Sequence, residues 1–486
     1  MAFDLVLFGG TGDLTWRKLM PALFQAWRHG KLPEGGRIVA VSRQEMSDDA
    51  YRTWVKERFH EVEDAKRPSD DEFDRFAAHL HHLRLDLSQG GDYARLKAWL
   101  ASPIGRVGPA EVVVMYLATS PDLFPVVCAQ LGVVGLNGPN VRVVIEKPLG
   151  HDLASAQRIN RVVRSVFNEA QEFRIDHYLG KPAVQNLMAL RFGNVLFEPL
   201  WRRECIANVQ ITIAESIGVG TRGDFYSRTG ALRDMIQNHA LQLLTMVAME
   251  PPSRMVADAI RDEKLKVLRS LKPFGADSVG RDVVRGQYRA GNVDGKPVPG
   301  LLEEDKVAAE STVETFVAMR TEVQNWRWAG VPFYLRTGKR LAERDAQIVV
   351  NFRPTPHTLF PGSNPPNKLV IKLQPEDGLE LHLLAAKGAG QAEALAPVSL
   401  DLDFDKAFAA NRVGAYERLL LDAIAGRLNL FVRSEEQEEA WRWVEPVLES
   451  WRADDAPPRP YAAGTWGPAA ASALVARDGF TWAEEQ

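Results

Sequence analysis

Cysteine is scarce in this chain: its 486 residues include only two, Cys128 and Cys205. They lie far apart and show none of the short spacings of metal-binding cysteines, so neither a metal site nor a disulfide is expected. Reduced thiols are typical of a cytoplasmic protein. No apolar run approaches the length of a membrane span, and the N-terminus runs into a strand-like segment, Phe3 to Phe8, without a basic signal region. We therefore expect a cytoplasmic protein with no membrane partner.

A strong excess of charge of either sign is also absent. The net charge of −4 argues against nucleic acid as a partner. It does not argue against a small phosphorylated ligand, because a few local lysines can outweigh a weak global field. The apolar fraction of 45% and the charged fraction of 25% are typical of a globular protein. The length exceeds what one hydrophobic core usually serves, which predicts two domains.

The first 175 or so residues alternate short apolar runs with helix-like segments such as residues 14–29. Four of the runs are strand-like and a fifth is weaker: residues 4–8, 37–41, 111–117 and 141–145, and residues 83–87. Fully apolar strands that alternate with helices predict a parallel sheet covered on both faces. We therefore assign residues 1–178 to an α/β domain of the Rossmann type.

The pattern changes after residue 180, where strand-like segments alternate apolar and polar residues and often follow one another without a helix between them. These segments are residues 207–215, 313–320, 331–335, 346–352 and 368–374. Helices are expected at residues 231–249, 416–425 and 436–451. This texture predicts that residues 179–486 form an α+β domain with a large, mostly antiparallel sheet.

Three glycines, Gly9, Gly10 and Gly12, follow the first expected strand and precede a helix. Glycine permits a tight turn and a close approach of the backbone to a pyrophosphate at the helix N-terminus. The spacing differs from G-x-G-x-x-G, and the alternative is a tight turn without a ligand. Its position in the first strand-turn-helix unit favours a dinucleotide site.

The end of the second strand, Val41-Ser42-Arg43-Gln44, carries no acidic residue. An NAD-specific domain normally places Asp or Glu there for the ribose hydroxyls. Arg43 can instead pair with a 2′-phosphate through its planar guanidinium group. NADP is therefore favoured, although a solvated Arg43 and tolerance of NAD stay open.

Six consecutive positions, Asp176 to Lys181, hold an acid, an imidazole, a phenol and an ammonium group. A buried strand does not tolerate this density of polar groups without partners, and a solvated loop does not need the tyrosine. A pocket for a small, hydroxylated, anionic molecule explains both. The run lies at the expected domain boundary, where binding sites are common.

His239 lies on or beside the apolar stripe of the helix expected at residues 231–249. A lone histidine there is more often a core residue than a catalyst, but several polar residues share the same two turns. One of them, Asp234, is five residues away, which on a regular α-helix separates the two side chains by about 140°. Both can reach one ligand only if the helix starts between them or is locally distorted.

Five runs occur in order along the chain: Gly9 to Leu14, Glu146 to Gly150, Arg174 to Lys181, Arg233 to His239 and Leu335 to Lys339. Together they resemble the glucose-6-phosphate dehydrogenase family, and the likeness extends from residue 4 to the region of Trp466. The resemblance implies oxidation of D-glucose 6-phosphate at C1 to 6-phospho-D-glucono-1,5-lactone, with hydride transfer to NADP+. This reaction is the first step of the pentose phosphate pathway.

The resemblance also assigns the residues of the site. His239 would be the general base for the C1 hydroxyl, and its ordinary pKa of about 6.5 leaves it mostly neutral near pH 7. Asp176 would orient that imidazole. His177, Tyr178 and Lys181 would hold the phosphate. The complete substrate set is Lys147, His177, Tyr178, Lys181, Glu215, Asp234, Lys339 and Arg344, the last standing where many relatives have lysine.

The cofactor set implied by the resemblance gathers around the glycine turn and the ends of the parallel strands. After Ala118 this chain has Thr119, Ser120 and Pro121, where many relatives have two or three prolines. Taken alone, Lys147 would be an exposed lysine paired with Glu146. The set is Gly9, Gly10, Thr11, Gly12, Asp13, Leu14, Arg43, Asp86, Leu87, Ala118 and Lys147.

Members of this family form homodimers or homotetramers through the large sheet, and no metal is expected. The nearest alternative is another NADP-dependent sugar oxidoreductase, of the glucose–fructose oxidoreductase type. Such proteins share the Glu-Lys-Pro turn but lack the run from Asp176 to Lys181 and the Asn-His helix. A non-catalytic NADP-sensing protein is a second alternative, and it would be expected to have lost His239 or the phosphate donors.

Overall fold

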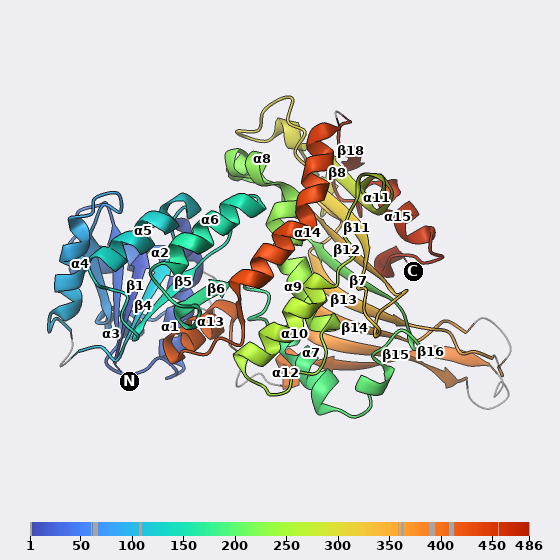
Figure 1. Ribbon diagram of the computed structural model, residues 1–486, viewed down its shortest axis with the longest axis horizontal. Helices are drawn as coiled ribbons and strands as arrows, with labels where there is room; N and C mark the ends of the chain where they lie inside the picture. Colours follow the sequence, from blue (N-terminus) through green and yellow to red (C-terminus); the bar gives the residue numbers. More distant parts are fainter. Residues whose placement is uncertain are drawn as a thin grey trace. The chain divides into compact units, whose positions relative to one another are not determined.

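Two units, each built around its own sheet, divide the chain in the computed structural model (Figure 1). The first unit comprises Met1–Gly180, Met255–Arg261 and Val413–Glu438, and the second comprises Lys181–Arg254, Asp262–Arg412 and Glu439–Gln486. The structure describes residues 2–59, 61, 67–105, 109–357, 359–360, 364–387, 394–407, 413–454 and 456–485.

The sheet of the first unit has seven strands in the order β17-β6-β5-β4-β1-β2-β3, and only β17 runs antiparallel to its neighbour. Its strands are β1 (Phe3–Phe8), β2 (Arg37–Ser42), β3 (Leu80–Arg84), β4 (Val112–Leu117), β5 (Val141–Ile145), β6 (Glu172–Ile175) and β17 (Phe431–Val432). The order 3-2-1-4-5-6 is that of a Rossmann domain. The predicted fold of this part is therefore confirmed.

Alternate residues of β1 enter two different cores, as the pleat requires. Phe3, Leu5 and Leu7 lie in a core with α1 (Met20–Arg28), α2 (Asp48–Phe59), α3 (Asp70–Ala77) and α13 (Ala415–Ala425). Val6 and Phe8 lie in the other core with α4 (Asp92–Ala101), α5 (Phe124–Val133) and α6 (Leu153–Arg164). Burial on both faces explains why these strands are apolar throughout.

The weaker strand expected at residues 83–87 lies instead at Leu80–Arg84. The predicted bounds were wrong because they rested on an apolar run, whereas the observed strand contains His81 and His82. Both are buried, and each makes hydrogen bonds to the segment after β2. Buried polar groups are tolerated when they have such partners.

The sheet of the second unit has nine strands, and six of its eight neighbouring pairs are antiparallel. The two parallel pairs are β7 with β12 and β8 with β18. In spatial order the strands are β16 (Leu395–Asp403), β15 (Gly378–Ala386), β14 (Lys368–Gln374), β13 (Asp345–Phe352), β7 (Ile206–Ala214), β12 (Pro332–Gly338), β11 (Phe316–Glu322), β8 (Val283–Arg289) and β18 (Arg459–Ala462). The predicted large, mostly antiparallel sheet is confirmed.

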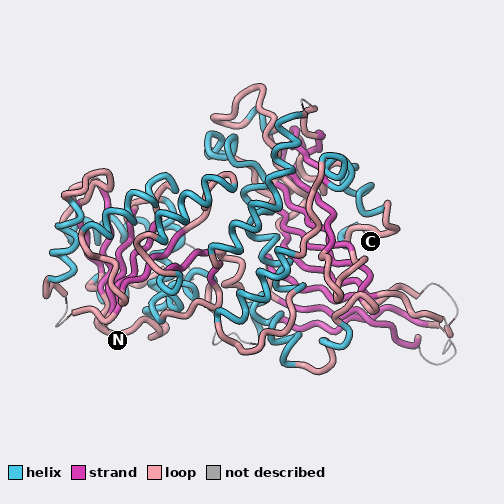
Figure 2. Tube along the Cα trace, in the orientation of Figure 1, coloured by secondary structure: helices cyan, strands magenta, loops and turns pink. Residues whose placement is uncertain are grey.

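Helices cover much of this second sheet (Figure 2). The helix expected at residues 231–249 is present as η7 (Leu232–Ala240), which is π-helical, followed by α9 (Leu241–Ala248). The other longer helices of the unit are α7 (Pro182–Gly193), α8 (Gly223–Ala231), α15 (Ala469–Ala476) and most of α10 (Ala257–Arg269) and α14 (Ser434–Ala453). Within the residues that the structure describes, no helix has the length and apolar character needed to span a membrane.

Candidate active site

The glycine turn follows β1 at the carboxyl edge of the first sheet. The backbone N–H groups of Gly9 and Gly10 donate to the Val41 carbonyl at 3.0 and 2.9 Å. Gly9 has φ +86°, and a Cβ there would lie 2.5 Å from the Ala118 carbonyl oxygen, while a Cβ on Gly10 would collide with Ala40. Glycine is therefore required at both positions, and the turn is fixed against β2 and β4.

The remaining predicted cofactor residues surround this turn at the ends of neighbouring strands. Thr11, Asp13 and Leu14 complete the turn, which continues into η1 (Thr15–Leu19) and α1. Arg43 is exposed after β2, and Asp86 follows β3. Hydrogen bonds from Ser88 lower the pKa of Asp86, and the charges of Arg43 and Arg84 lower it further.

Leu87 is partly exposed beside Asp86, and its carbonyl accepts a hydrogen bond from the Tyr93 hydroxyl at 3.0 Å. Ala118 follows β4, and its N–H donates to the Phe8 carbonyl at 3.0 Å. The predicted cofactor set thus gathers along one edge of the parallel sheet, the edge at which open α/β sheets bind ligands.

Lys147 follows β5 and is joined to Pro148 by a cis peptide bond. Its neighbour Glu146 is 5% exposed and accepts a hydrogen bond from the Tyr116 hydroxyl at 2.6 Å. Burial raises the pKa of Glu146, opposed by hydrogen bonds from Tyr116 and from Tyr416 on α13. The charge and the backbone N–H of Lys147 also lower the pKa of Glu146. The two residues therefore interact, but Glu146 is buried among tyrosines and Lys147 is only partly exposed.

The run from Asp176 to Lys181 forms the turns that follow β6. Asp176 is 3% exposed, and its Oδ1 accepts the N–H of Tyr178 at 2.9 Å. The His177 ring stacks on Tyr416, with centroids 6.0 Å apart and planes at 16°. Tyr416 thus contacts both His177 and Glu146. Sequence reasoning missed it because it lies far along the chain and outside the five runs.

Lys181 belongs to the second unit, where it precedes α7 and its Nζ donates to the Leu373 carbonyl at 3.1 Å. Pro182 occupies the first position of α7, a placement that proline favours.

Asp234 and His239 both lie in the π-helical segment η7. In a π-helix the backbone bonds join residues five apart, so these two residues are one turn apart instead of 140° apart. The Leu241 N–H donates to the Ile236 carbonyl, which is such a bond. His239 is fully buried and Asp234 partly exposed. The local distortion that the spacing required is present.

Glu215 and Lys339 follow the parallel neighbours β7 and β12 and therefore meet at one end of the second sheet. Lys339 Nζ lies 2.6 Å from Glu215 Oε2 and 5.2 Å from the centre of the Tyr226 ring. Burial raises the pKa of Tyr226 well above its usual value, and the charges of Asp234, Glu314 and Glu215 raise it further. Asp234, Glu215 and Lys339 are thus gathered around one tyrosine that no sequence motif had indicated.

Arg344 is exposed in the turn before β13.

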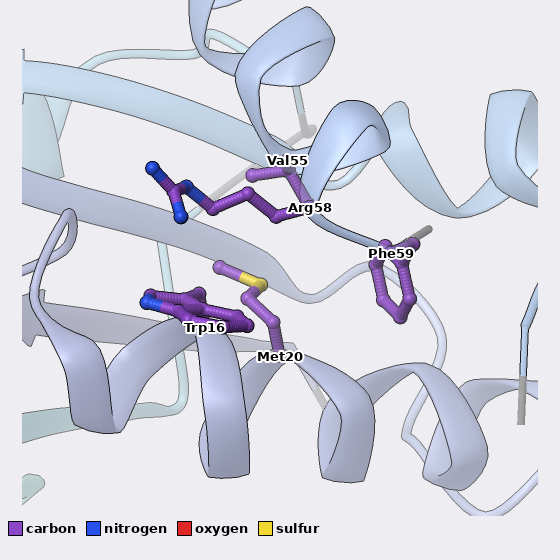
Figure 3. A pocket seen from close by; sticks show the side chains of 5 residues that line it. All are labelled: Trp16, Met20, Val55, Arg58 and Phe59. Carbon is purple, nitrogen blue, oxygen red and sulfur yellow. The ribbon is translucent and has the colours of Figure 1, made fainter. Parts of the chain in front are cut away.

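A small cavity lies beside the helix that follows the glycine turn. Figure 3 shows Arg58 extended above Trp16, with Met20 next to the indole. The guanidinium carbon is 5.2 Å from the centre of that ring. The cavity, of about 10 Å³, has room for about one water molecule. It is too small for a nucleotide or a sugar.

A metal site in a protein needs several acidic, histidine or cysteine side chains close together. Over the described ranges, no three of them are grouped in a way that could hold a metal ion.

Two family models of known proteins together match nearly the whole chain. Residues 6–186 match the family model described as glucose-6-phosphate dehydrogenase, NAD binding domain, and residues 188–483 match glucose-6-phosphate dehydrogenase, C-terminal domain. Glucose-6-phosphate 1-dehydrogenase of Mycolicibacterium smegmatis is 48% identical over 99% of this chain and 97% of its own length. The enzyme of Rhizobium meliloti is 47% identical over 99% of this chain and 97% of its own length.

Solved structures agree with the sequence comparison. A glucose-6-phosphate dehydrogenase in complex with its substrate glucose-6-phosphate superposes with a TM-score of 0.90 at 32% identity, over 99% of this chain and 98% of that one. The enzyme from Mycobacterium avium gives 0.84 at 36% identity, over 99% of both chains. The chain belongs to the glucose-6-phosphate dehydrogenase family.

Proposed function

We propose that this protein oxidises D-glucose 6-phosphate at C1 to 6-phospho-D-glucono-1,5-lactone, with transfer of the hydride to NADP+, as the first step of the pentose phosphate pathway. The observation that carries the proposal is that two models of one enzyme family together match residues 6–186 and 188–483. The glucose–fructose oxidoreductase type is not favoured, because neither of these matches points to it.

His239 is the proposed general base. It accepts the proton of the C1 hydroxyl, and the buried carboxylate of Asp176 orients the imidazole and stabilises its protonated form. Support comes from η7, in which Asp234 and His239 are one turn apart, so that both can face one sugar. The nicotinamide supplies the hydride acceptor.

The substrate contacts follow from charge and hydrogen-bonding capacity. His177, Tyr178 and Lys181 supply donors to the phosphate. Glu215 and Asp234 accept hydrogen bonds from sugar hydroxyls, and their gathering around Tyr226 supports a shared task. Lys147, Lys339 and Arg344 complete the proposed set, with Lys147 also at the cofactor.

NADP is the proposed cofactor, with NAD as a tolerated second. The glycine turn leaves no room for side chains at Gly9 and Gly10, which suits a backbone that approaches a pyrophosphate. Arg43 is exposed at the end of β2, where the 2′-phosphate would lie. We assign cofactor binding to residues 1–178, and substrate binding and oligomerisation to residues 179–486.

We further propose that two or four copies assemble through the large sheet. The edge strand β16 exposes Val398, Leu400 and Leu402, which are 42%, 60% and 47% exposed, on one face. Opposite them on β15 lie Leu383, Leu381 and Leu379. A row of aliphatic side chains across two strands is an expected site for a second copy. A cytoplasmic location is proposed from the two free thiols.

The test is the appearance of NADPH absorbance when the protein is mixed with glucose 6-phosphate and NADP+. Reduction should require both compounds, and unphosphorylated glucose at the same concentration should be a much poorer substrate. An active preparation of a relative provides the assay control. No reduction by folded protein would contradict the proposal, and equal rates with both sugars would remove the phosphate contacts from it.

A further inference from the structure

The loop that carries Arg43 is attached to a histidine of the neighbouring strand. The ring of His82 on β3 is buried, with 7% of the residue exposed. Its Nε2 lies 2.9 Å from Ser42 Oγ, and its Nδ1 lies 3.2 Å from the Met46 carbonyl oxygen. Ser42 ends β2, and Met46 lies in the loop two residues before α2, so the exposed Arg43 lies between the two points of attachment.

These contacts define the protonation of the imidazole. A carbonyl oxygen only accepts hydrogen bonds, so Nδ1 carries a proton and donates to Met46. In the neutral ring, Nε2 then accepts from the Ser42 hydroxyl. The Ser42 oxygen also accepts the N–H of Gln44 at 3.3 Å. Burial lowers the pKa of His82, which favours this neutral form. One imidazole thus connects the strand end, the residue after Arg43 and the end of the loop.

His82 is itself held by the beginning of α2. Its backbone N–H donates to Asp48 Oδ1 at 2.8 Å, and the other carboxylate oxygen bonds His81 Nδ1 at 2.8 Å. The Tyr51 ring packs against the His82 ring with centroids 5.4 Å apart, and its hydroxyl donates to the Gly10 carbonyl at 2.9 Å. The same cluster therefore joins the loop after β2 to the glycine turn.

We propose that His82 is a positioning residue that determines cofactor specificity: it fixes residues 42–46 so that the Arg43 guanidinium meets the 2′-phosphate of NADP. The inference rests on the proposed role of Arg43 in NADP binding. A loose loop would have to be ordered when NADP binds, at a cost in binding free energy. It would also let Arg43 turn toward Asp86, whose carboxylate already responds to its charge.

Binding of nucleotide fragments tests this without turnover. Calorimetry with 2′,5′-ADP and 5′-AMP measures the contribution of the 2′-phosphate in the native protein and in His82→Phe, which removes both ring nitrogens. We expect His82→Phe to lower the affinity for 2′,5′-ADP by about three- to tenfold and the affinity for 5′-AMP by less than about twofold. In steady-state assays, the KM for NADP should rise by a larger factor than kcat falls, and the KM for NAD should change little.

A double-mutant cycle separates positioning from general stability. In an Arg43→Ala background, His82→Phe should leave the ratio of the two affinities unchanged, because no guanidinium remains to be placed. Ser42→Ala removes one of the two attachments without altering the histidine, and it serves as the second variant if His82→Phe does not fold. Like His82→Phe, it should lower the ratio of the affinity for 2′,5′-ADP to the affinity for 5′-AMP.

His79→Phe is the matched control. His79 Nδ1 donates to the Gly36 carbonyl at 2.8 Å, the same kind of bond at the other end of these two strands. Its loss should leave the affinity ratio unchanged.

Three results overturn the inference: an unchanged ratio in folded His82→Phe and Ser42→Ala, equal losses for both nucleotides, or independent effects of His82→Phe and Arg43→Ala. If the native protein prefers 2′,5′-ADP and both His82→Phe and Ser42→Ala keep that preference, the role of His82 is contradicted but NADP as the cofactor is not. A native protein that binds both nucleotides equally contradicts the proposed cofactor as well.

Discussion

Asp234 and His239 lie one turn apart because the segment that carries them is π-helical. An α-helix would direct these side chains about 140° away from each other. π-helical turns are rare and occur frequently at functional sites, since they shift the side chains that follow relative to those that precede. The buried imidazole of His239 and the partly exposed carboxylate of Asp234 therefore lie on the same side of η7.

Replacement of His239 by asparagine should separate chemistry from binding. Asparagine cannot accept the proton, so kcat should fall by about two to four decades while the KM for glucose 6-phosphate barely changes. Steady-state kinetics with saturating NADP measures both values. Comparable losses in kcat and in affinity would assign His239 to substrate holding instead.

Lys181→Ala should act on the phosphate. Loss of a charge-assisted hydrogen bond is expected to raise the KM for glucose 6-phosphate by about tenfold or more, with unphosphorylated glucose little affected. Lys181 also donates to the Leu373 carbonyl, so the thermal midpoint of the variant should be measured as a control. An equal effect on both sugars would remove the phosphate assignment.

Arg43→Ala should shift the cofactor preference toward NAD. The guanidinium is expected to contribute about one to two decades of affinity for the 2′-phosphate and none for a hydroxyl. The ratio of kcat/KM for NADP to that for NAD gives the result. Arg75, an exposed arginine of α3 that pairs with Asp71, offers a control in Arg75→Ala. A ratio that stays at the native value would show that another group recognises the phosphate.

Leu400→Glu should weaken self-association. Leu400 lies at the centre of the exposed aliphatic row on β16, and a charge there would lose its hydration on burial between two copies. Light scattering after size exclusion should show a smaller species than the native oligomer. Ser399→Glu places the same charge on the opposite face of the strand and should leave the mass unchanged. Equal masses for all three proteins would place the interface elsewhere.

Asp345→Asn should stabilise the second unit, and more so at high pH. Burial raises the pKa of Asp345 to about 7, with Glu484 and Glu343 adding to the effect. The unfolded value is about 3.9, so between these values the folded protein holds a proton that the unfolded chain has lost. The free energy of unfolding therefore falls as the pH rises from about 4 to 7. Above pH 7 the whole destabilisation by the ionised, buried carboxylate remains.

Thermal melts of Asp345→Asn should then show a gain of a few degrees, about 2–4 °C for each kcal/mol, at pH 8 and a smaller gain at pH 5. Glu310→Gln, which removes a charge from an exposed turn of the same unit, is the control and should change the midpoint little. The same gain at both pH values would mean that the effect does not come from the proton.

Local patterns explain why so much of the fold could be predicted. The apolar runs of β1, β4 and β5 are buried on both faces, so their composition alone indicated a covered parallel sheet. β3 could not be located in this way, because His81 and His82 are buried with hydrogen-bond partners that the sequence does not reveal. The parallel neighbours β7 and β12 were likewise not predictable, since alternation of residues does not say which strands pair.

By itself, the sequence determined the family, the glycine turn and the short polar runs, because each depends on a few neighbouring residues whose chemistry is local. Only the tertiary structure decided that Glu215 and Lys339 meet around Tyr226, and that Tyr416 joins Glu146 to His177. It also decided the π-helical turn under Asp234 and His239. These relationships depend on packing and hydrogen bonds between distant segments, which no local pattern of residues encodes.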